Sequence, residues 1–449
     1  MLVLWTGFLP TLWLVCKNMT LPMTGAGPSG AGGGLAYLLR APFTGDDQGY
    51  ANAQVLDTVA EGITAGSLTV AESAGTLALV SNKCAYTGGG GWFVTFLISQ
   101  AIDRALGRTL LATISKSATN TFAPVLLWNS DASFADFTEL QGFGAHFPNS
   151  ANLQAMNRAG LVPTIGAYAA ATDYQVALVL GGYTASGIPW YTGQTPTDYL
   201  YGQTAFIKGG AYTTWTRLFQ VILHNDDPIY AVVTSYNATG TFDSIRVPDV
   251  SLSTLLQPTH LSTFDAANGT SLDAITPEIG TGWTEDTGNW DIQGNKANVV
   301  SLVGSVARAT VDSGLSDCVI HCTVRMTGAA TDMALMFRYT DTSNYWYLVA
   351  SYSGNTIAIQ ELQGGVWAQR AFSVYTINRD TDYQLLITLS GNDIRVCIDG
   401  AVATTYTSSF NAAATKHGLW AYNVVGYTFD NFAVYPRTSA VYDAALDAV

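Results

Sequence analysis

Acidic residues are the groups of this chain that could catalyse hydrolysis. Cleavage of a glycosidic bond uses two carboxyl groups about 5–10 Å apart, one as acid and the other as nucleophile or base. Alternate residues of one strand would supply that spacing, but no two of the six Glu stand so in a predicted strand: Glu61, Glu72, Glu139, Glu278, Glu285 and Glu361. The five His are equally scattered, without a Ser-His-Asp or metal-ligand spacing. We therefore expect a protein that is not an enzyme.

Aromatic residues offer a different chemistry, because their rings stack on the apolar faces of sugars while a few polar groups fix orientation. In NYWYLV (344–349), Tyr345 and Tyr347 would share one strand face, and Trp346 would point into the core. In β domains such rings are also common in the core, which is the alternative for each of them. The candidate carbohydrate-binding residues are Arg338, Tyr345, Tyr347, Trp367, Arg370, Trp420 and Tyr422, together with Trp190 and Tyr191 of an inserted segment.

Two aspartates recur in the same motif, TFD, at Asp243 and Asp430. Each could accept backbone N–H groups where the last strand of a domain begins. The alternative is a calcium ligand, since Ca²⁺ takes six to eight oxygen ligands, carboxylates among them. Asp265 would lie near Asp430 if the first and last strands of that domain pair, so calcium is the possible cofactor.

The elements that must position these residues come in two copies. TDYQVALVL (172–180) and TDYQLLITL (381–389) are each followed, in the same order, by matched turn residues and a TFD motif. A period of roughly two hundred residues indicates duplicated domains, not a solenoid. Short strands separated by turn signals predict an all-β sandwich or barrel for each copy.

The expected organisation has five parts. Residues 1–35 form an apolar, Gly-rich N-terminal arm that could be a signal, an anchor or the result of an upstream start codon. Residues 36–250 form the first β domain with an inserted hairpin at 183–203, and residues 251–262 form a short linker. Residues 263–437 form the second domain, and 438–449 form a frayed or lightly docked C-terminal tail.

Composition restricts the partners. The formal net charge is −14 and only 12% of residues are charged, well below the roughly 25% of ordinary soluble domains. Binding to a phosphate backbone needs clustered Lys and Arg, so we expect no nucleic acid as a partner.

The apolar stretch at the start of the sequence is too short for a membrane span. Five irregularly spaced Cys predict buried free thiols, although Cys397 could pair with Cys318 or Cys322.

Longer stretches resemble a known fold family. FDAANGTSLDAITPEIGTGWTEDTGNWDIQGNKA (264–297), MFRYTDTSNYWYLV (336–349), DYQLLITLSGNDIRVCIDG (382–400) and GYTFDNFAVY (426–435) are similar to concanavalin A-like, laminin G-like domains. LAYLLRAPFT (35–44), FIKGGAYTTWTRLF (206–219) and TFDSIRVPD (241–249) resemble a relative of that family in phage-like proteins. The resemblance implies two tandem jelly-roll β-sandwiches of the kind found in phage virion and bacterial surface proteins.

These observations favour a non-enzymatic structural or adhesive protein of a virion surface or the extracellular space. Its expected partners are a glycan or host-surface receptor, other virion or surface proteins, and further copies of itself. A secreted polysaccharide-binding module or glycoside hydrolase of the same superfamily is one alternative. A purely architectural capsid or filament subunit is the other.

Overall fold

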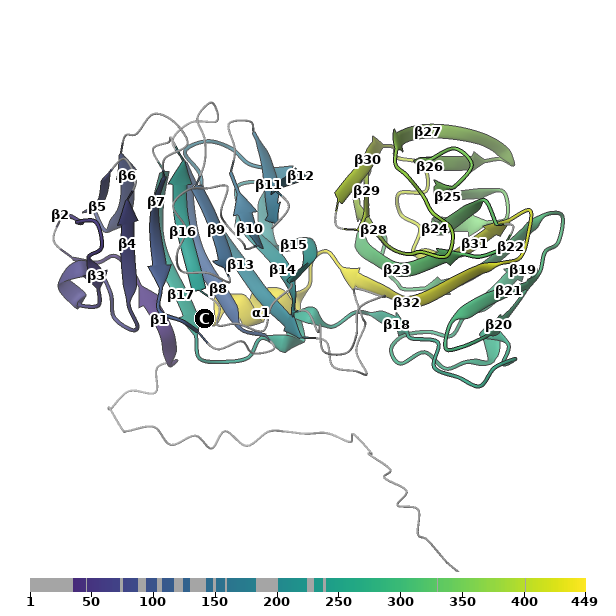
Figure 1. The fold of residues 1–449 in the computed structure, drawn as a ribbon, viewed down its shortest axis with the longest axis horizontal. Coiled ribbons are helices and arrows are strands. Elements are labelled where there is room, and N and C mark those ends of the chain that lie inside the picture. The colour runs from purple at the N-terminus through teal and green to yellow at the C-terminus, as the bar shows by residue number, and fades with distance from the viewer. Residues whose placement is uncertain are drawn as a thin grey trace, which may run out of the picture. The chain divides into compact units, whose positions relative to one another are not determined.

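The computed structural model describes residues 35–449 except for 46, 73–75, 88–93, 103–106, 117–123, 130–142, 148–150, 158–159, 183–200, 224–229, 237–239, 329 and 400. The described residues from Ala36 onward form one compact unit. Within it, two antiparallel β-sandwiches follow each other along the chain (Figure 1). The predicted all-β fold with two tandem sandwiches is confirmed.

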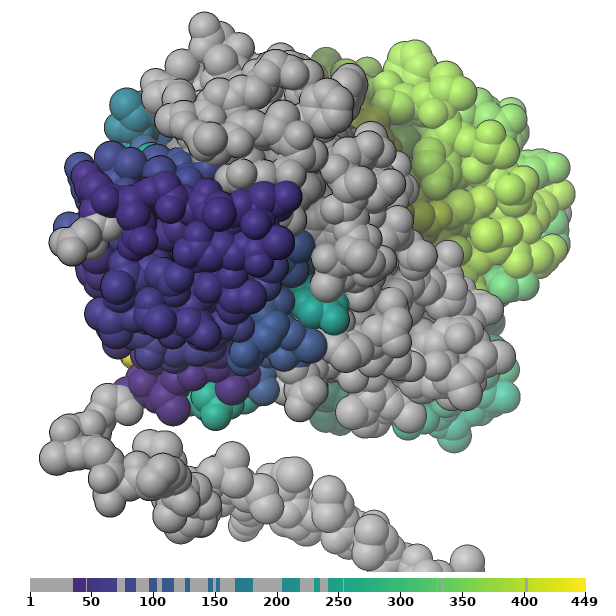
Figure 2. All heavy atoms as spheres, turned by 60° about the vertical axis from the view of Figure 1, so that its left-hand side comes forward, coloured from purple at the N-terminus to yellow at the C-terminus, as the bar shows by residue number. Residues whose placement is uncertain are grey.

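The first sandwich consists of two sheets. Sheet 1 contains β15 (Tyr212–Leu223), β14 (Tyr201–Gly209), β13 (Asp173–Gly182), β8 (Thr109–Lys116), β17 (Gly240–Pro248), β6 (Lys83–Thr87), β5 (Thr76–Val80) and β2 (Gln48–Gly49), with β1 (Tyr37–Ala41) on β17. Sheet 2 contains β12 (Gly160–Ala167), β11 (Asn152–Asn157), β10 (Phe143–His146), β9 (Pro124–Asn129), β16 (Tyr230–Tyr236), β7 (Val94–Ser99), β4 (Leu68–Glu72) and β3 (Val55–Leu56). The N-terminal strands lie at one edge of both sheets, and their residues are the purple spheres of Figure 2.

The second sandwich is built in the same way. Sheet 3 contains β20 (Asn289–Ile292), β21 (Ala297–Ser301), β32 (Tyr427–Pro436), β23 (Cys318–Met326), β28 (Asp382–Ser390), β29 (Asp393–Ile398) and β30 (Ala401–Thr407), with β18 (His260–Ser262) on β32. Sheet 4 contains β19 (Thr284–Thr287), β22 (Val306–Asp312), β31 (Lys416–Tyr422), β24 (Asp332–Asp341), β25 (Asn344–Ser351), β26 (Thr356–Gln363) and β27 (Val366–Val374). Among the described residues, short 3-10 helices lie at Val59–Glu61, Ser253–Leu256 and Leu272–Ala274.

The repeated sequence motif occupies the same place in both sandwiches. The strand order β14-β13-β8-β17 of sheet 1 recurs as β29-β28-β23-β32 in sheet 3. In each copy the motif's tyrosine accepts a backbone N–H from five residues earlier: Tyr174 from Ala169 at 2.8 Å and Tyr383 from Asn378 at 2.7 Å. The tyrosine therefore holds the turn that leads into its own strand.

Each sandwich encloses its own apolar core. Trp128 lies in the first core, where its indole N–H donates to the Leu178 carbonyl at 3.0 Å. Trp346 lies in the second core and donates to the Phe410 carbonyl at 2.9 Å. Because both indoles satisfy their polar atom, these large rings are buried without an unpaired donor.

The end of the chain is docked, which is one of the two predicted alternatives for the tail, frayed or lightly docked. Residues Ala440–Asp447 form helix α1, capped by Ser439, a helix that was not predicted. Tyr442 and Leu446 of α1 pack against Phe206 and Trp215 on the outer face of sheet 1, and Figure 1 shows the yellow helix beside the first sandwich. The sequence pattern missed the helix because eight residues carry too little periodicity.

Four cysteines lie in the described residues, and all are free thiols: Cys84, Cys318, Cys322 and Cys397. Cys318 and Cys322 both face the second core, as their spacing predicted, whereas Cys397 packs on the other side of sheet 3. Cys16 lies outside the described residues. None of the helices in the described part of the chain has the length and apolar character needed to cross a bilayer.

The repeated tyrosines give a test of this architecture. Tyr174→Phe and Tyr383→Phe each remove the acceptor of one part-buried backbone N–H, so each should lower the free energy of unfolding by about 0.5–1.5 kcal/mol. Urea unfolding followed by tryptophan fluorescence measures the loss. Tyr352→Phe, at an exposed tyrosine, is the matched control and should change nothing. Equal stability of all four proteins would contradict the assigned role.

Candidate functional site

The outer face of sheet 4 gathers most of the predicted aromatic residues. In β25, Trp346, Leu348 and Ala350 point into the core, so Tyr345 and Tyr347 point outward. The same alternation turns Trp420 of β31 outward, next to Leu419 and Ala421, which point inward. Cross-strand pairing places Leu362 opposite both Tyr345 and Trp367, so Trp367 shares the outer face.

The rings form a continuous row, here called the aromatic face and defined by Tyr345, Tyr347, Trp367, Trp420 and Tyr422. Tyr347 stacks on Trp420 with centroids 4.8 Å apart, and Trp420 stacks on Tyr422 at 5.6 Å with an interplanar angle of 8°. Tyr345 lies 5.5 Å from Tyr347. Three strands, β31, β25 and β27, thus present rings on one surface, with β24 and β26 between them.

Exposure differs between the middle and the flanks of this row. Trp420 is only 6% exposed because its neighbours cover it, whereas Tyr422 is 40% and Trp367 is 56% exposed. Trp367 belongs to β27, the outermost strand of sheet 4. A ligand would therefore meet the exposed rings first, and the packed central rings would hold them in place.

Polar groups surround the aromatic face, and sequence reasoning missed them. Arg308 of β22 lies with its guanidinium 5.6 Å from the centre of the Tyr345 ring. It donates to the Tyr345 hydroxyl at 3.2 Å and to Thr287 Oγ1 at 2.8 Å. The Trp420 indole N–H reaches the same tyrosine hydroxyl at 3.4 Å. With two donors directed at its oxygen, the Tyr345 hydroxyl is left to donate its own proton.

One carboxylate joins this network. Asp286 accepts from Thr310 Oγ1 at 2.6 Å and from the Tyr339 hydroxyl at 3.3 Å. Arg308 and Asp286 carried no recognisable motif, since their strands lie far from β25 in the sequence and meet it only in the folded sheet. Register pairing between β22 and β31, which sets Arg308 opposite Trp420, was the signal that could have found Arg308.

The phenols of Tyr347 and Tyr339 are neutral at physiological pH. Burial, reinforced by Tyr345, raises the pKa of Tyr347 well above its usual range. Burial and the charge of Asp286 raise the pKa of Tyr339 in the same direction. These hydroxyls therefore act as neutral hydrogen-bond donors and acceptors, which suits an uncharged, hydroxyl-rich ligand.

Two predicted residues lie elsewhere. Arg338 is fully buried, sits at a β-bulge with φ of 48° and points toward Asp317, 3.8 Å away. The bulge shifts the strand alternation, so spacing from the sequence placed this residue wrongly. Arg370 pairs with Glu361 at 2.7 Å, and Glu361 shares its strand face with Trp346, opposite to the aromatic face. Trp190 and Tyr191 lie outside the described residues.

The aspartates predicted for calcium do not all lie in the same sandwich. Asp243 belongs to β17 of the first sandwich, whereas Asp265 is exposed and Asp430 is half-buried in the second. In the part of the chain that the structure describes, no group of three or more His, Cys, Asp or Glu is placed to hold a metal ion. Calcium binding stays a prediction, and a calorimetric titration without heat or shift in melting temperature would contradict it.

Comparisons with known proteins give only distant likenesses. No family model and no curated protein matches the chain. A carbohydrate-binding module of family 66 from Bacillus subtilis is 16% identical, with a TM-score of 0.31, over 34% of this chain and 96% of that one. Domain 4 of AbnA, an extracellular arabinanase from Geobacillus stearothermophilus, is 14% identical, with a TM-score of 0.29, over 43% and 98%. Chicken galectin 2 is 12% identical, with a TM-score of 0.22, over 26% and 88%.

Asp430 gives a prediction of pH dependence. Burial, only partly opposed by Lys296, raises the pKa of Asp430 from 3.8 to about 7. In this window the folded protein keeps a proton that the unfolded chain has lost, so stability falls as the pH rises from about 4 to 7. Asp430→Asn should therefore raise the free energy of unfolding by roughly 1–3 kcal/mol at pH 8 and have little effect at pH 4.

Urea unfolding at pH 4, 6 and 8 measures this difference between the two proteins. Asp265→Asn is the matched control, because Asp265 is exposed, and it should shift stability equally at every pH. A stabilisation by Asp430→Asn that does not vary with pH would show that the carboxyl titrates normally.

Proposed function

We propose that the protein is a non-enzymatic glycan-binding protein whose aromatic face receives the sugar. The observation that carries this proposal is the stacked row of Tyr347, Trp420 and Tyr422 on the outer side of sheet 4. Rings of this kind present flat apolar surfaces to the C–H groups of a pyranose, and nearby hydroxyls fix its orientation.

The packing of sheet 4 argues that these rings are more than part of the apolar core. The inner side of sheet 4 already carries its own apolar set, including Trp346, Phe337 and Leu419, packed against sheet 3. A second apolar set on the outer side is not needed to close the sandwich. Its polar surroundings, Arg308 and Asp286, match a ligand with hydroxyl groups better than a purely apolar partner.

We further propose a location for the protein, and this proposal rests on the sequence resemblance alone. That resemblance favours a component of a virion or cell surface, where a weak glycan site gains strength when several copies engage one surface. A purified virion or surface fraction probed with an antibody against this chain would test the location.

Binding should depend on the exposed rings. In a glycan-array screen of the full chain, followed by titration of the best oligosaccharide, Trp367→Ala and Tyr422→Ala should each weaken affinity about 3- to 10-fold, because each removes one stacking contact. Both side chains are exposed, so neither change should disturb folding.

Tyr352→Ala is the control, since Tyr352 is as exposed as Tyr422 but lies in the turn between β25 and β26. It should bind like the unchanged protein. Failure of the full chain to bind any glycan would overturn the proposal. Glycan binding that is unchanged by both substitutions would show that the glycan binds at another place on the protein.

A second candidate function is self-assembly through the edge of sheet 4. Strand β27 ends the sheet and exposes four apolar side chains, Val366, Trp367, Phe372 and Val374. An exposed apolar edge strand is a template for pairing with another chain, here a second copy of the protein.

Sedimentation velocity tests this candidate over a wide concentration range. The full chain should associate, and Val374→Lys should shift it toward the monomer, because a charge on an edge strand opposes pairing. A chain that sediments as a monomer at every concentration would exclude assembly through β27.

A further inference from the structure

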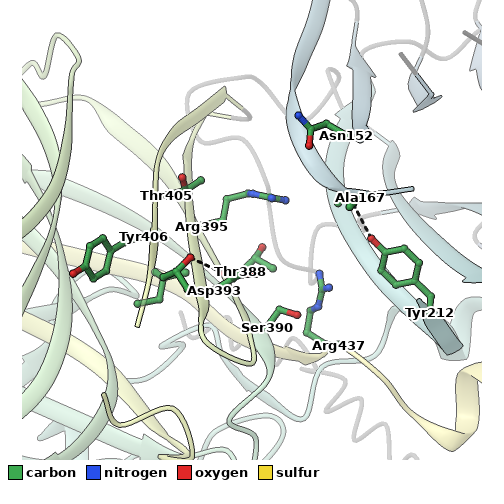
Figure 3. Close-up of a pocket in the computed structure, with 13 residues that line it drawn as sticks. Asn152, Ala167, Tyr212, Thr388, Ser390, Asp393, Arg395, Thr405, Tyr406 and Arg437 are labelled. Atoms are coloured by element: carbon green, nitrogen blue, oxygen red, sulfur yellow. Dashed lines mark hydrogen bonds between the residues drawn. The ribbon is translucent and has the colours of Figure 1, made fainter. Parts of the chain in front are cut away.

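A cavity of about 570 Å³ lies against the outer face of sheet 3. Thr388 and Ser390 of β28 and Arg395 of β29 line one side, and Tyr212 of β15 lines the other. Figure 3 shows Arg395 and Arg437 extending into the same space. Its volume is in the range of small-molecule sites, and it is on the opposite sheet of the sandwich from the aromatic face.

Two guanidinium groups in this cavity have unsatisfied atoms. The Nε atoms of Arg395 and Arg437 are both buried without a hydrogen-bond partner among the described residues. Neither side chain forms an ion pair with any described carboxylate. Arg437 is only 7% exposed. Burial, and to a smaller extent the charge of Arg395, lowers the pKa of Arg437 to about 10, so Arg437 stays charged at neutral pH.

Two carboxylates lie near these guanidinium groups, and each already accepts a hydrogen bond. Asp393, which itself lines the cavity, accepts from Thr407 Oγ1 at 2.7 Å, and Asp317 accepts the Gly391 N–H at 2.8 Å. A buried donor without a partner is costly. Two guanidinium groups that each carry such a donor, directed into one cavity, are an arrangement that an oxyanion would satisfy, since guanidinium N–H groups bind carboxylate, sulfate and phosphate oxygens in pairs.

Hydroxyl groups make up much of the remaining wall, which also includes the Asp393 carboxylate. Thr388, Ser390 and Thr405 add side-chain hydroxyls around Arg395. The Tyr212 hydroxyl accepts the Ala167 N–H at 3.1 Å, as Figure 3 shows, and keeps its own proton for donation. These groups match a ligand that carries several hydroxyls beside its negative charge.

We propose that this cavity binds an acidic saccharide, with Arg395 and Arg437 holding its carboxylate or sulfate group. The site does not depend on the aromatic face, and either one can exist without the other. The positive pair provides the charge recognition, and the hydroxyl-lined wall contacts the sugar ring.

Isothermal titration of the full chain with glucuronate, using glucose as the uncharged counterpart, tests the proposal. Glucuronate should bind and glucose should not bind at this site. Arg395→Gln should weaken the affinity for glucuronate about tenfold or more, because it removes a charged hydrogen-bond donor. Loss of glucuronate binding in Trp367→Ala would instead place the acidic sugar on the aromatic face and overturn the proposal.

Arg325→Gln is the matched control, because Arg325 is a partly exposed arginine of sheet 3 that pairs with Asp382 at 3.6 Å, and it should retain glucuronate binding. Arg437→Gln should repeat the effect of Arg395→Gln; if it fails to fold, Arg395→Gln decides. Sodium sulfate, compared with sodium chloride at equal ionic strength, should raise the melting temperature more for the unchanged protein than for Arg395→Gln, because sulfate also stabilises proteins without occupying a site. Absence of glucuronate binding, or equal binding by Arg395→Gln, would overturn the proposal, and a sulfate effect without glucuronate binding would overturn the saccharide assignment.

Discussion

The two-residue period of the strands around a filled core is the constraint on which the rest of this structure depends. Trp346 occupies the space between sheets 3 and 4, stacked on Phe337 at 6.4 Å. Once that ring is inside, Tyr345 and Tyr347 must point outward, because neighbouring side chains of a strand lie on opposite faces. A register slip of one residue would exchange the two sets, so the packing of one indole fixes the placement of the candidate site.

A second constraint joins the end of the chain to the first sandwich. Arg217 of β15 is fully buried, with its guanidinium 4.8 Å from the Tyr435 ring and 5.6 Å from the Tyr442 ring. It also donates to the Leu255 carbonyl at 2.6 Å. The backbone N–H of Arg217 donates to the Arg437 carbonyl at 2.8 Å. The contacts of Arg217 that hold α1 against the first sandwich therefore also fix the position of Arg437. In this way they help to shape the cavity beside Arg395.

The limits of prediction from the sequence follow from the same physics. Local alternation in NYWYLV was enough to place Tyr345 and Tyr347 outward and Trp346 inward, and the repeated TDYQ strands were enough to predict two sandwiches. Arg338 was misplaced because a bulge breaks the alternation that the inference used. Arg308 and the pair Arg395 and Arg437 were missed because strands far apart in sequence bring each of them to its partners, and no local pattern records such pairing.

The positive pair Arg395 and Arg437 stands in a chain whose net charge is negative, so it forms a local exception at which an anion can bind. With 33 acidic and 19 basic residues the protein carries a formal charge of −14, so its average surface repels anions. At physiological ionic strength such repulsion is screened beyond about 8 Å, whereas groups in a cavity act at contact distance with little screening. An anionic ligand would therefore be recognised only where the two guanidinium groups meet it, while a neutral ligand on the aromatic face would be nearly indifferent to net charge.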